Sequence, residues 1–254
     1  MIKIEKLNKS FGKLSVLQDI NLHFEGNQVL AIIGPNGSGK TTLIKLLLGM
    51  VVPDTGKIWV NQQLITDSCN YRQHLGYMPQ IGHYPDNMKI SQLFEMMMDI
   101  RKGLHSASLD EELIEEFGLR KIMHKTMSTL SGGTKQKVSA ALAFLFNPII
   151  LILDEPTAGL DPLSSEILKE KIQRENLKGK LILITSHIMS DLDELATDVL
   201  YLYEGKVQFF KSLEALKVES NEQKLGKIIA RLMQRGETST TNHHRLHSQS
   251  ILSL

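Results

Sequence analysis

A glycine-rich segment at residues 34–42 restricts the fold of this chain more than any other feature. It reads Gly-Pro-Asn-Gly-Ser-Gly-Lys-Thr-Thr, follows an apolar run at 29–33 and leads into an apolar helical pattern. A strand, a G-x-x-x-x-G-K-[ST] loop and a helix in this order predict a phosphate site. In such a site, backbone N–H groups of the loop surround the phosphates of a nucleoside triphosphate, and the positive end of the helix dipole attracts them. Lys40 is expected to reach the β- and γ-phosphates, and the Thr41 hydroxyl to bind Mg²⁺.

Residues 149–153 form a second continuous apolar run, which is followed by Asp154 and Glu155. Such a run is typical of a strand buried on both faces of a parallel sheet, and ligands bind such sheets at the carboxyl ends of the strands. Asp154 is therefore expected to hold Mg²⁺, directly or through water. Glu155 is expected to accept a proton from the attacking water or to orient it. Together, the two segments predict an ATPase or GTPase.

Two further segments place polar groups where they can meet phosphate. Ser131, Gly132 and Gly133 precede an apolar helical pattern at 138–146. Ser131 has the side chain of an N-cap, and the glycines leave the backbone bare, so this helix start can also bind phosphate. The alternative is an ordinary capped helix. His187 follows the apolar run at 181–185, where it can reach a γ-phosphate, and a structural histidine is the alternative there.

Composition and charge limit the partners and the cellular compartment that the sequence predicts. Its 254 residues carry a formal net charge of +1, which gives no argument for a nucleic-acid partner. The single cysteine, Cys69, excludes an internal disulfide and fits a reducing cytosol. No apolar stretch reaches the ~18 residues of a membrane-spanning helix, and the first residues alternate like a strand rather than a signal peptide. We therefore expect a cytoplasmic protein without direct membrane insertion, attached to a membrane only through a partner.

In these motifs and their order, residues 1 to about 215 resemble the ATP-binding subunit of ABC transporters. The resemblance covers seven features of that family: the A-loop aromatic, the Walker A loop, the Q-loop, the signature motif, the Walker B strand with its catalytic Glu, the D-loop and the H-switch. In this chain they are Phe11, residues 34–42, Gln80, residues 130–134, residues 150–155, residues 158–161 and His187.

Two positions depart from the family pattern. Thr134 stands where the signature usually has Gln, and Phe11 stands where Tyr is commoner. We expect activity to be retained, with only the γ-phosphate or ribose contacts altered, because Ser131 and both signature glycines are intact. Stacking on adenine needs the ring of Phe11 and not a hydroxyl.

The resemblance implies ATP as the nucleotide and Mg²⁺ as its metal ion, and it assigns the site residues. Catalysis is expected to depend on Glu155, His187, Lys40 and Gln80. Mg²⁺ is expected to be bound by Thr41, Gln80 and Asp154. ATP is expected to contact Phe11, Gly34, Pro35, Asn36, Gly37, Ser38, Gly39, Lys40, Thr41, Thr42, Ser131, Gly132 and Gly133.

The resemblance and the strand and helix patterns predict one α/β architecture. We expect a P-loop NTPase core with a mostly parallel sheet, an N-terminal antiparallel β subdomain and a helical subdomain at about 86–147. The strand patterns at 56–60 and 75–78 are expected to join the antiparallel region, and residues 201–209 to form a hairpin with a glycine turn. The ATP-binding domain is expected over residues 1–215. A short helix and a disordered tail are expected over 216–254.

The resemblance also implies partners and a working cycle. Two copies of the subunit are expected to face each other head to tail, with each ATP between the Walker A loop of one and the signature motif of the other. ATP binding is expected to close this homodimer, and hydrolysis to open it. An integral membrane permease subunit is expected to dock near residues 77–100, holding the ATPase on the inner face of the cell membrane.

Alternatives remain for the function and for the subgroup. A soluble ABC-type ATPase in a non-transport process, such as metal-cluster assembly, is the second hypothesis. Within transporters, the segments at 77–85 and 130–137 are similar to a subgroup tied to nitrous-oxide reductase maturation, which serves copper-site assembly. The cargo and the direction of transport depend on the membrane subunit, so this chain does not specify them.

Two other segments permit a metal-binding interpretation. Met96, Met97 and Met98 are soft ligands for Cu(I), but consecutive residues of a helix point in different directions, which favours a role in a core or groove. His243, His244 and His247 lie in a tail rich in Ser and Thr. A metal site and a disordered tail are the two hypotheses for that tail.

Overall fold

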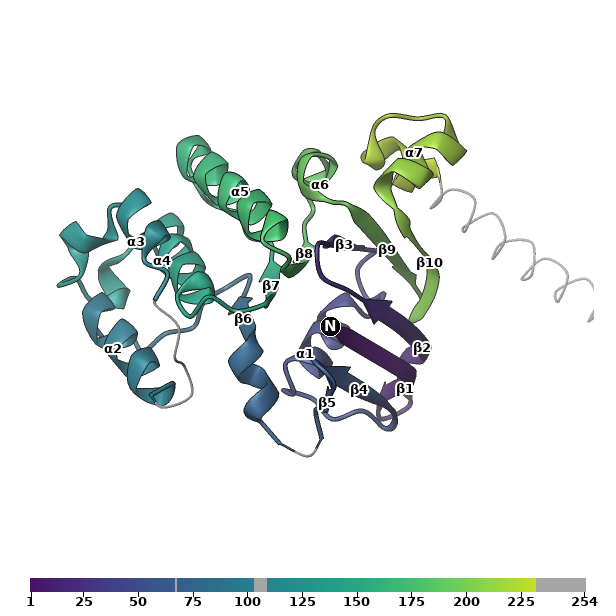
Figure 1. The fold of residues 1–254 in the computed structure, drawn as a ribbon, viewed down its shortest axis with the longest axis horizontal. Coiled ribbons are helices and arrows are strands. Elements are labelled where there is room, and N and C mark those ends of the chain that lie inside the picture. The colour runs from purple at the N-terminus through teal and green to yellow at the C-terminus, as the bar shows by residue number, and fades with distance from the viewer. Residues whose placement is uncertain (67, 103–108, 232–254) are drawn as a thin grey trace, which may run out of the picture.

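The computed structural model describes residues 1–66, 68–102 and 109–231, and it contains two sheets with helices packed around them (Figure 1). The smaller sheet is antiparallel, with strand order β2-β1-β4-β5. Its strands are β1 (Ile2–Phe11), β2 (Leu14–Phe24), β4 (Thr55–Val60) and β5 (Gln63–Leu64).

The larger sheet has strand order β10-β9-β3-β8-β7-β6, and all its neighbours are parallel except β9 and β10. Its strands are β3 (Val29–Ile33), β6 (Leu75–Met78), β7 (Ile150–Asp154), β8 (Leu181–Thr185), β9 (Asp198–Tyr203) and β10 (Lys206–Ser212). The predicted combination of a mostly parallel sheet with an N-terminal antiparallel β subdomain is therefore confirmed.

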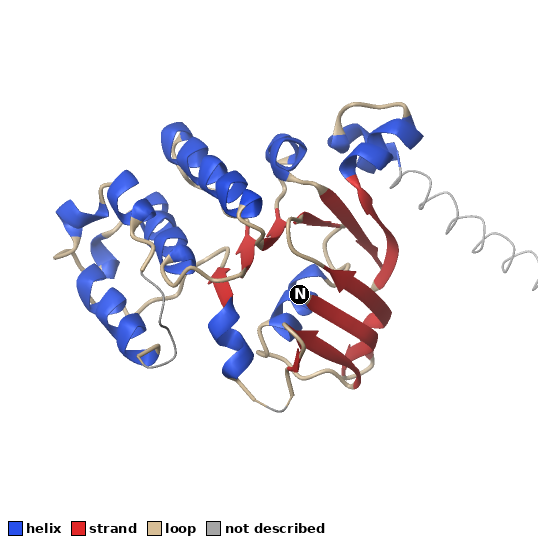
Figure 2. Ribbon diagram, in the orientation of Figure 1, coloured by secondary structure: helices blue, strands red, loops and turns tan. Residues whose placement is uncertain are grey.

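Figure 2 shows α2, α3 and α4 gathered at one end of the molecule, away from the antiparallel sheet. The labelled helices are α1 (Lys40–Leu47), α2 (Ile90–Ile100), α3 (Glu112–Glu116), α4 (Gly132–Phe144), α5 (Pro162–Leu177), α6 (Met189–Leu195) and α7 (Leu213–Ser220), and a further helical segment begins at Leu225. Short 3-10 helices occur at Asn70–His74, Leu119–Ile122 and Met127–Thr129.

The parallel strands separate two hydrophobic cores because successive side chains of a strand point to opposite faces. In β3, Leu30 and Ile32 pack with α1 and the antiparallel sheet. Ala31 and Ile33 of the same strand pack on the other face with α4, α5, α6 and α7. All five residues of β3 and of β8 are buried, which explains their uninterrupted apolar sequences.

The strand at 75–78 lies in a different sheet from the one predicted. The strand at 56–60 joins the antiparallel sheet as expected, but β6 pairs in parallel with β7, with Leu75 opposite Ile150. The reason lies in Gly76: a Cβ there would be 2.1 Å from the Ala143 carbonyl oxygen, so the backbone of α4 packs directly on β6. The sequence pattern does not reveal this contact, because it joins residues far apart in the chain.

The hairpin predicted at 201–209 is confirmed as β9 and β10. Glu204 and Gly205 form the turn with φ of 48° and 75°, and positive values at both central residues are those of a type I′ hairpin loop.

The last described part of the chain, residues 213–229, packs on the same core as α4, α5 and α6. α7 crosses residue 215, and Leu225, Ile228 and Ile229 are buried beyond it. The helical turn that begins at Leu225 is capped by the Asp193 carboxylate, which accepts from the Leu225 N–H at 3.1 Å. The domain division at 215 stays a prediction. The tail histidines, His243, His244 and His247, lie outside the described residues.

A buried ion cluster ties α5 to the start of α3. Lys171 is 1% exposed, and its Nζ lies 2.6 Å from the Asp110 carboxylate and 2.7 Å from that of Glu112. Glu175, one turn further along α5, is fully buried and pairs with Lys171, Lys178 and Lys180. The cluster therefore holds the helical end of the molecule against α5.

We expect Lys171→Met to lower the free energy of unfolding by about 3 kcal/mol, because it leaves the Asp110 carboxylate, 15% exposed, without its cation and removes one of the three cations of the buried Glu175. The matched control is Lys178→Met, whose exposed ammonium also contacts Glu175 and whose loss should cost at most about 1 kcal/mol. Urea unfolding followed by circular dichroism measures both. Equal unfolding midpoints for the two variants would contradict the prediction.

Candidate active site

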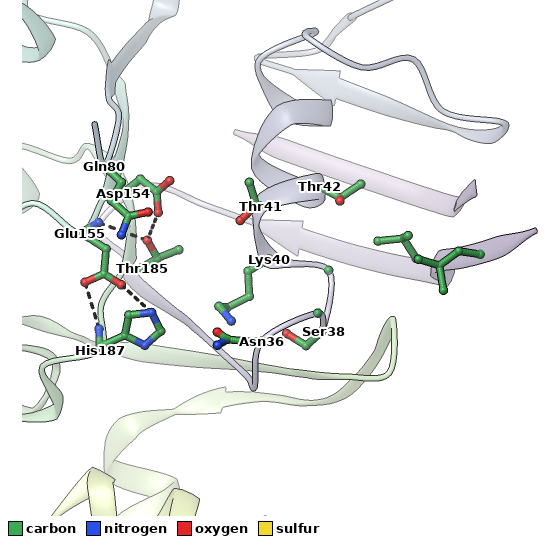
Figure 3. Close-up of a pocket in the computed structure, with 14 residues that line it drawn as sticks. Asn36, Ser38, Lys40, Thr41, Thr42, Gln80, Asp154, Glu155, Thr185 and His187 are labelled. Carbon is green, nitrogen blue, oxygen red and sulfur yellow. Dashed lines mark hydrogen bonds and ion pairs between the residues drawn. The ribbon is translucent and has the colours of Figure 1, made fainter. Parts of the chain in front are cut away.

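A pocket of about 310 Å³ opens where β3, β7 and β8 reach their carboxyl ends (Figure 3). This is the edge at which parallel sheets bind ligands. Eleven of the residues predicted for the site line it: Asn36, Gly37, Ser38, Gly39, Lys40, Thr41, Thr42, Gln80, Asp154, Glu155 and His187. Lys40 and Thr41 lie on one side, with Gln80, Asp154, Glu155 and His187 on the other.

The loop before α1 has the backbone of a phosphate cradle. Gly37 and Gly39 have φ of 80° and 105°, and a Cβ on Gly39 would lie 2.6 Å from a methyl carbon of Leu17, so glycine is required there. Ser38 Oγ is buried and has no hydrogen-bond partner among the described residues. A buried hydroxyl and bare N–H groups at a helix start suit the oxygen atoms of phosphate.

Lys40 is the first residue of α1, and its ammonium donates to the carbonyls of Gly34 at 2.6 Å and Pro35 at 3.0 Å. Burial lowers the pKa of Lys40 below that of an ordinary lysine, although the negative charges of Glu155 and Asp154 act in the opposite direction. The cation is thus placed over the loop and feels the carboxylates across the pocket.

Asp154 ends β7 and Glu155 follows it, and both carboxylates lie at the pocket. Thr185, at the end of β8, holds Asp154, and His187, two residues later, holds Glu155. The Thr185 hydroxyl donates to the Asp154 carboxylate. The Glu155 carboxylate accepts from the His187 backbone N–H at 3.1 Å, and its other oxygen lies 3.3 Å from His187 Nε2 (Figure 3). Glu155 itself is 6% exposed, so its carboxylate has little freedom to turn away from the pocket.

The oxygen donors that line the pocket fit a magnesium ion. The Thr41 hydroxyl on one wall, and the Gln80 amide and Asp154 carboxylate on the other, are hard oxygen ligands. Mg²⁺ in nucleotide sites is commonly held by one or two such protein groups together with phosphate oxygens. Bound there, the ion would neutralise the charge that develops on the phosphates.

The remaining predicted site residues do not line this pocket. Gly34 and Pro35 contribute the carbonyls that hold Lys40. Phe11, at the end of β1, is 51% exposed, with Lys9 Nζ 5.2 Å from its ring centroid.

The signature residues Ser131, Gly132 and Gly133 lie at the start of α4, also outside the pocket. The Ser131 N-cap is confirmed, since its hydroxyl accepts from the Thr134 N–H at 3.3 Å.

Three pocket residues were not predicted from the sequence: Leu14, Val16 and Thr185. Thr185 carried a usable signal, because it ends an apolar run directly before Ser186 and His187. Val16 and Leu14 carried none. They reach the pocket because β2 passes beside the loop, where the Gln18 N–H donates to the Gly205 carbonyl and the Gly205 N–H to that of Ser38.

The cradle, the lysine and the facing carboxylates define a P-loop nucleotide hydrolase. Residues 17–158 match the family described as ABC transporter. The chain is 34% identical over 219 residues to the lantibiotic transport ATP-binding protein SrtF of Streptococcus pyogenes, across 82% of this chain and 89% of SrtF. The chain therefore belongs to the ABC transporter family. It is an ATP-binding subunit, an ATPase whose hydrolysis of ATP energises transport, as the motifs predicted.

Solved structures agree with this assignment. One described as the ATP-binding subunit of an ABC transporter has a TM-score of 0.84 at 27% identity and covers 92% of this chain and 99% of that chain. The dimeric, post-hydrolysis cassette MJ0796 bound to ADP and Pi has a TM-score of 0.71 at 21% identity. The match covers 84% of this chain and 99% of that chain, and it shows similarity of fold alone. Within the described residues, every helix is too short or too polar to cross a membrane.

Proposed function

We propose that the pocket binds ATP with Mg²⁺ and that Glu155 is the general base for its hydrolysis. One observation carries this proposal: Lys40 and Thr41 face Gln80, Asp154, Glu155 and His187 across a single pocket. Lys40 would bind the β- and γ-phosphates within the cradle of residues 34–42, and Thr41, Gln80 and Asp154 would hold the metal ion. Phe11 would stack on adenine from the end of β1 in the antiparallel sheet.

Glu155 is suited to activate water because its carboxylate is buried at the pocket wall and fixed by the His187 N–H. Proton transfer to a carboxylate held in this way costs little reorganisation. His187 is 66% exposed at its side chain and lies beside Glu155, where it can reach the γ-phosphate. In this proposal residues 1–215 are the ATP-binding domain, with 86–147 as its helical subdomain.

A second copy of the chain would complete the site. Ser131 and Gly132 are exposed at the capped start of α4, with nothing of this chain's nucleotide pocket beside them. A helix start with bare glycines attracts phosphate, so ATP held on one subunit can bind the signature residues of another. The head-to-tail homodimer explains why one chain has two phosphate-binding helix starts. Its closure on ATP and its opening after hydrolysis would drive the transporter.

The partner that receives this motion would be an integral membrane permease. A groove of about 370 Å³ is lined mainly by apolar and aromatic side chains close to the Q-loop. It includes Met50, Leu75, Tyr77, Pro79, Tyr84, Met97 and Leu142, with Arg72 and Arg101 among them. Met50 is 61% exposed and nearby Ile81 67%, so the groove has an open apolar rim suited to a short helix of a membrane subunit. Such docking would place the protein on the cytoplasmic face of the membrane.

The finer subgroup, nitrous-oxide reductase maturation with copper processing, stays a prediction. It depends only on the segments at 77–85 and 130–137, and neither the family match nor the proteins named above concern that process. The cargo and the direction of transport depend on the permease.

The permease proposal is tested by a pull-down from detergent-solubilised native membranes. The bait is the tagged Glu155→Gln variant with ATP and Mg²⁺, which should hold the closed dimer, and captured proteins are identified by mass spectrometry. We expect a polytopic membrane protein in stoichiometric amount. Adding Met50→Glu to the bait should remove it, because a charge would enter the groove. Adding Met98→Glu should not, because Met98 is also exposed, at 37%, on α2 but does not line the groove.

Recovery of only soluble proteins would instead support the alternative, a soluble ABC-type ATPase in a non-transport process. Equal recovery of the membrane protein by the Met50→Glu and Met98→Glu baits would contradict the groove as its docking site.

A further inference from the structure

Gln136, in the second turn of α4, has a buried polar side chain that none of the site motifs uses. It is 6% exposed, and its Nε2 donates to the backbone carbonyl oxygen of Glu155 at 3.3 Å. A buried amide is costly unless it is hydrogen-bonded, so this contact fixes where the side chain lies. The helix that begins with the signature residues is thereby bonded to the residue that carries the proposed general base.

The backbone of Glu155 has a conformation that needs such support. Its φ is +52°, in the left-handed region that glutamate seldom adopts and that persists only where neighbouring groups fix it. The Glu155 N–H donates to the Thr185 carbonyl at 3.0 Å. Its carboxylate accepts from the His187 N–H. The Glu155 carbonyl accepts from the Ala158 N–H at 3.2 Å and from Gln136 at 3.3 Å, and Gln136 alone among these partners comes from the signature helix.

Two further contacts join the first turns of α4 to the loop that follows Glu155. A Cβ on Gly133 would lie 2.7 Å from the Gly159 carbonyl oxygen, so the two backbones are in close contact. Lys137 pairs with the Asp161 carboxylate at 2.8 Å. Because Gly133, Gln136 and Lys137 all hold residues 155–161, a displacement of α4 cannot leave Glu155 in place.

We propose that Gln136 is a positioning residue: it fixes the backbone of Glu155 and couples the signature helix to the catalytic carboxylate of the same subunit. The inference rests on the proposed role of Glu155. Gln136 does not line the pocket, and its contact with a lining residue is to the backbone carbonyl of Glu155, so it acts on turnover and leaves ATP binding unchanged. ATP held by the partner subunit would bind Ser131 and Gly132 of this subunit. The effect of that binding would then be transmitted through α4 to Glu155, in the catalytic centre of this subunit.

The test compares Gln136→Met with Lys135→Met in the full chain. Met matches Gln in length but cannot donate a hydrogen bond. Lys135 is the preceding residue, and within the described residues its side chain has no hydrogen bond or ion pair. Steady-state ATP hydrolysis gives kcat, a fluorescent ATP analogue gives affinity, and thermal unfolding reports stability. We expect Gln136→Met to lower kcat by about 10- to 100-fold, a loss typical of misplaced catalytic groups, with ATP affinity as in Lys135→Met.

Gln136→Glu keeps the shape of the side chain and replaces the N–H donor by an acceptor, so it should lose kcat like Gln136→Met. Each Gln136 variant is also made in the Glu155→Gln background, where it should lower the single-turnover rate no further, since both changes act on one group.

Two results would overturn the proposal in favour of simple packing. One is a wild-type kcat in Gln136→Glu. The other is a parallel loss of kcat, ATP affinity and unfolding temperature in Gln136→Met and Gln136→Glu. Additive losses in the double variants would overturn it as well. If Glu155→Gln itself hydrolysed ATP at the wild-type rate, the role of Glu155 would fail, which is a separate and distinguishable result.

Discussion

Glu155→Gln should retain ATP binding and lower the turnover of ATP by about 10²- to 10⁴-fold, the range expected for loss of a general base. The amide has the shape of the carboxylate, and its oxygen can still accept from the His187 N–H that fixes Glu155 at 3.1 Å. It cannot accept a proton from water. Phosphate release measures turnover, and equilibrium binding of a fluorescent ATP analogue measures affinity. Because hydrolysis is what opens the proposed dimer, the variant with ATP should elute from a sizing column as a dimer.

The matched control is Glu116→Gln, which makes the same chemical change on an exposed glutamate with no ion pair among the described residues. It should retain the wild-type rate and the wild-type nucleotide-dependent elution. A Glu155→Gln protein that hydrolyses ATP as fast as this control would remove Glu155 from the mechanism and leave Asp154 or His187 as candidates for the base.

The sequence predicted the elements that build this site because each has a local signature. A buried parallel strand leaves a continuous apolar run, as at 149–153, and a phosphate loop leaves its glycines and lysine at fixed spacing. The strand at 75–78 was assigned to the wrong sheet because its sheet is chosen by contact with α4 at Gly76, a property of the packed molecule.

The same division between local and long-range information holds at the site. Lys40, Thr41, Asp154, Glu155 and His187 were predicted from their own segments, and the structure brings them to one pocket. Gln136 was not singled out, since a glutamine in an apolar helix has no pattern of its own. The role proposed for it depends on a contact between residues far apart in the chain, its hydrogen bond to the carbonyl of Glu155, whose backbone is left-handed.

Lys40→Met should lower both ATP affinity and turnover, in contrast to Glu155→Gln. Hydrogen bonds to a charged group contribute about 1.5–3 kcal/mol each, so loss of the ammonium should weaken ATP binding by roughly 10- to 100-fold. The methionine side chain retains the apolar stem of the lysine beside the loop. The ammonium also donates to the carbonyls of Gly34 and Pro35, so its removal loosens the cradle as well as deleting the cation. Nucleotide affinity is measured by titration with a fluorescent ATP analogue, and turnover by phosphate release.

Lys45→Met is the control, because Lys45 lies exposed on the last turn of the same helix. The ATP affinity and the turnover of this variant should stay at the wild-type level.

The pH dependence of ATP affinity separates the effect of the Lys40 charge from general damage to the loop. Only the ammonium form binds phosphate, and burial lowers the pKa of Lys40, so wild-type affinity should fall as the pH rises through that pKa, below the range of an ordinary lysine. Lys45→Met should retain this fall and Lys40→Met should lose it. An equal alkaline fall in the Lys40→Met protein would show that another group controls the binding of ATP.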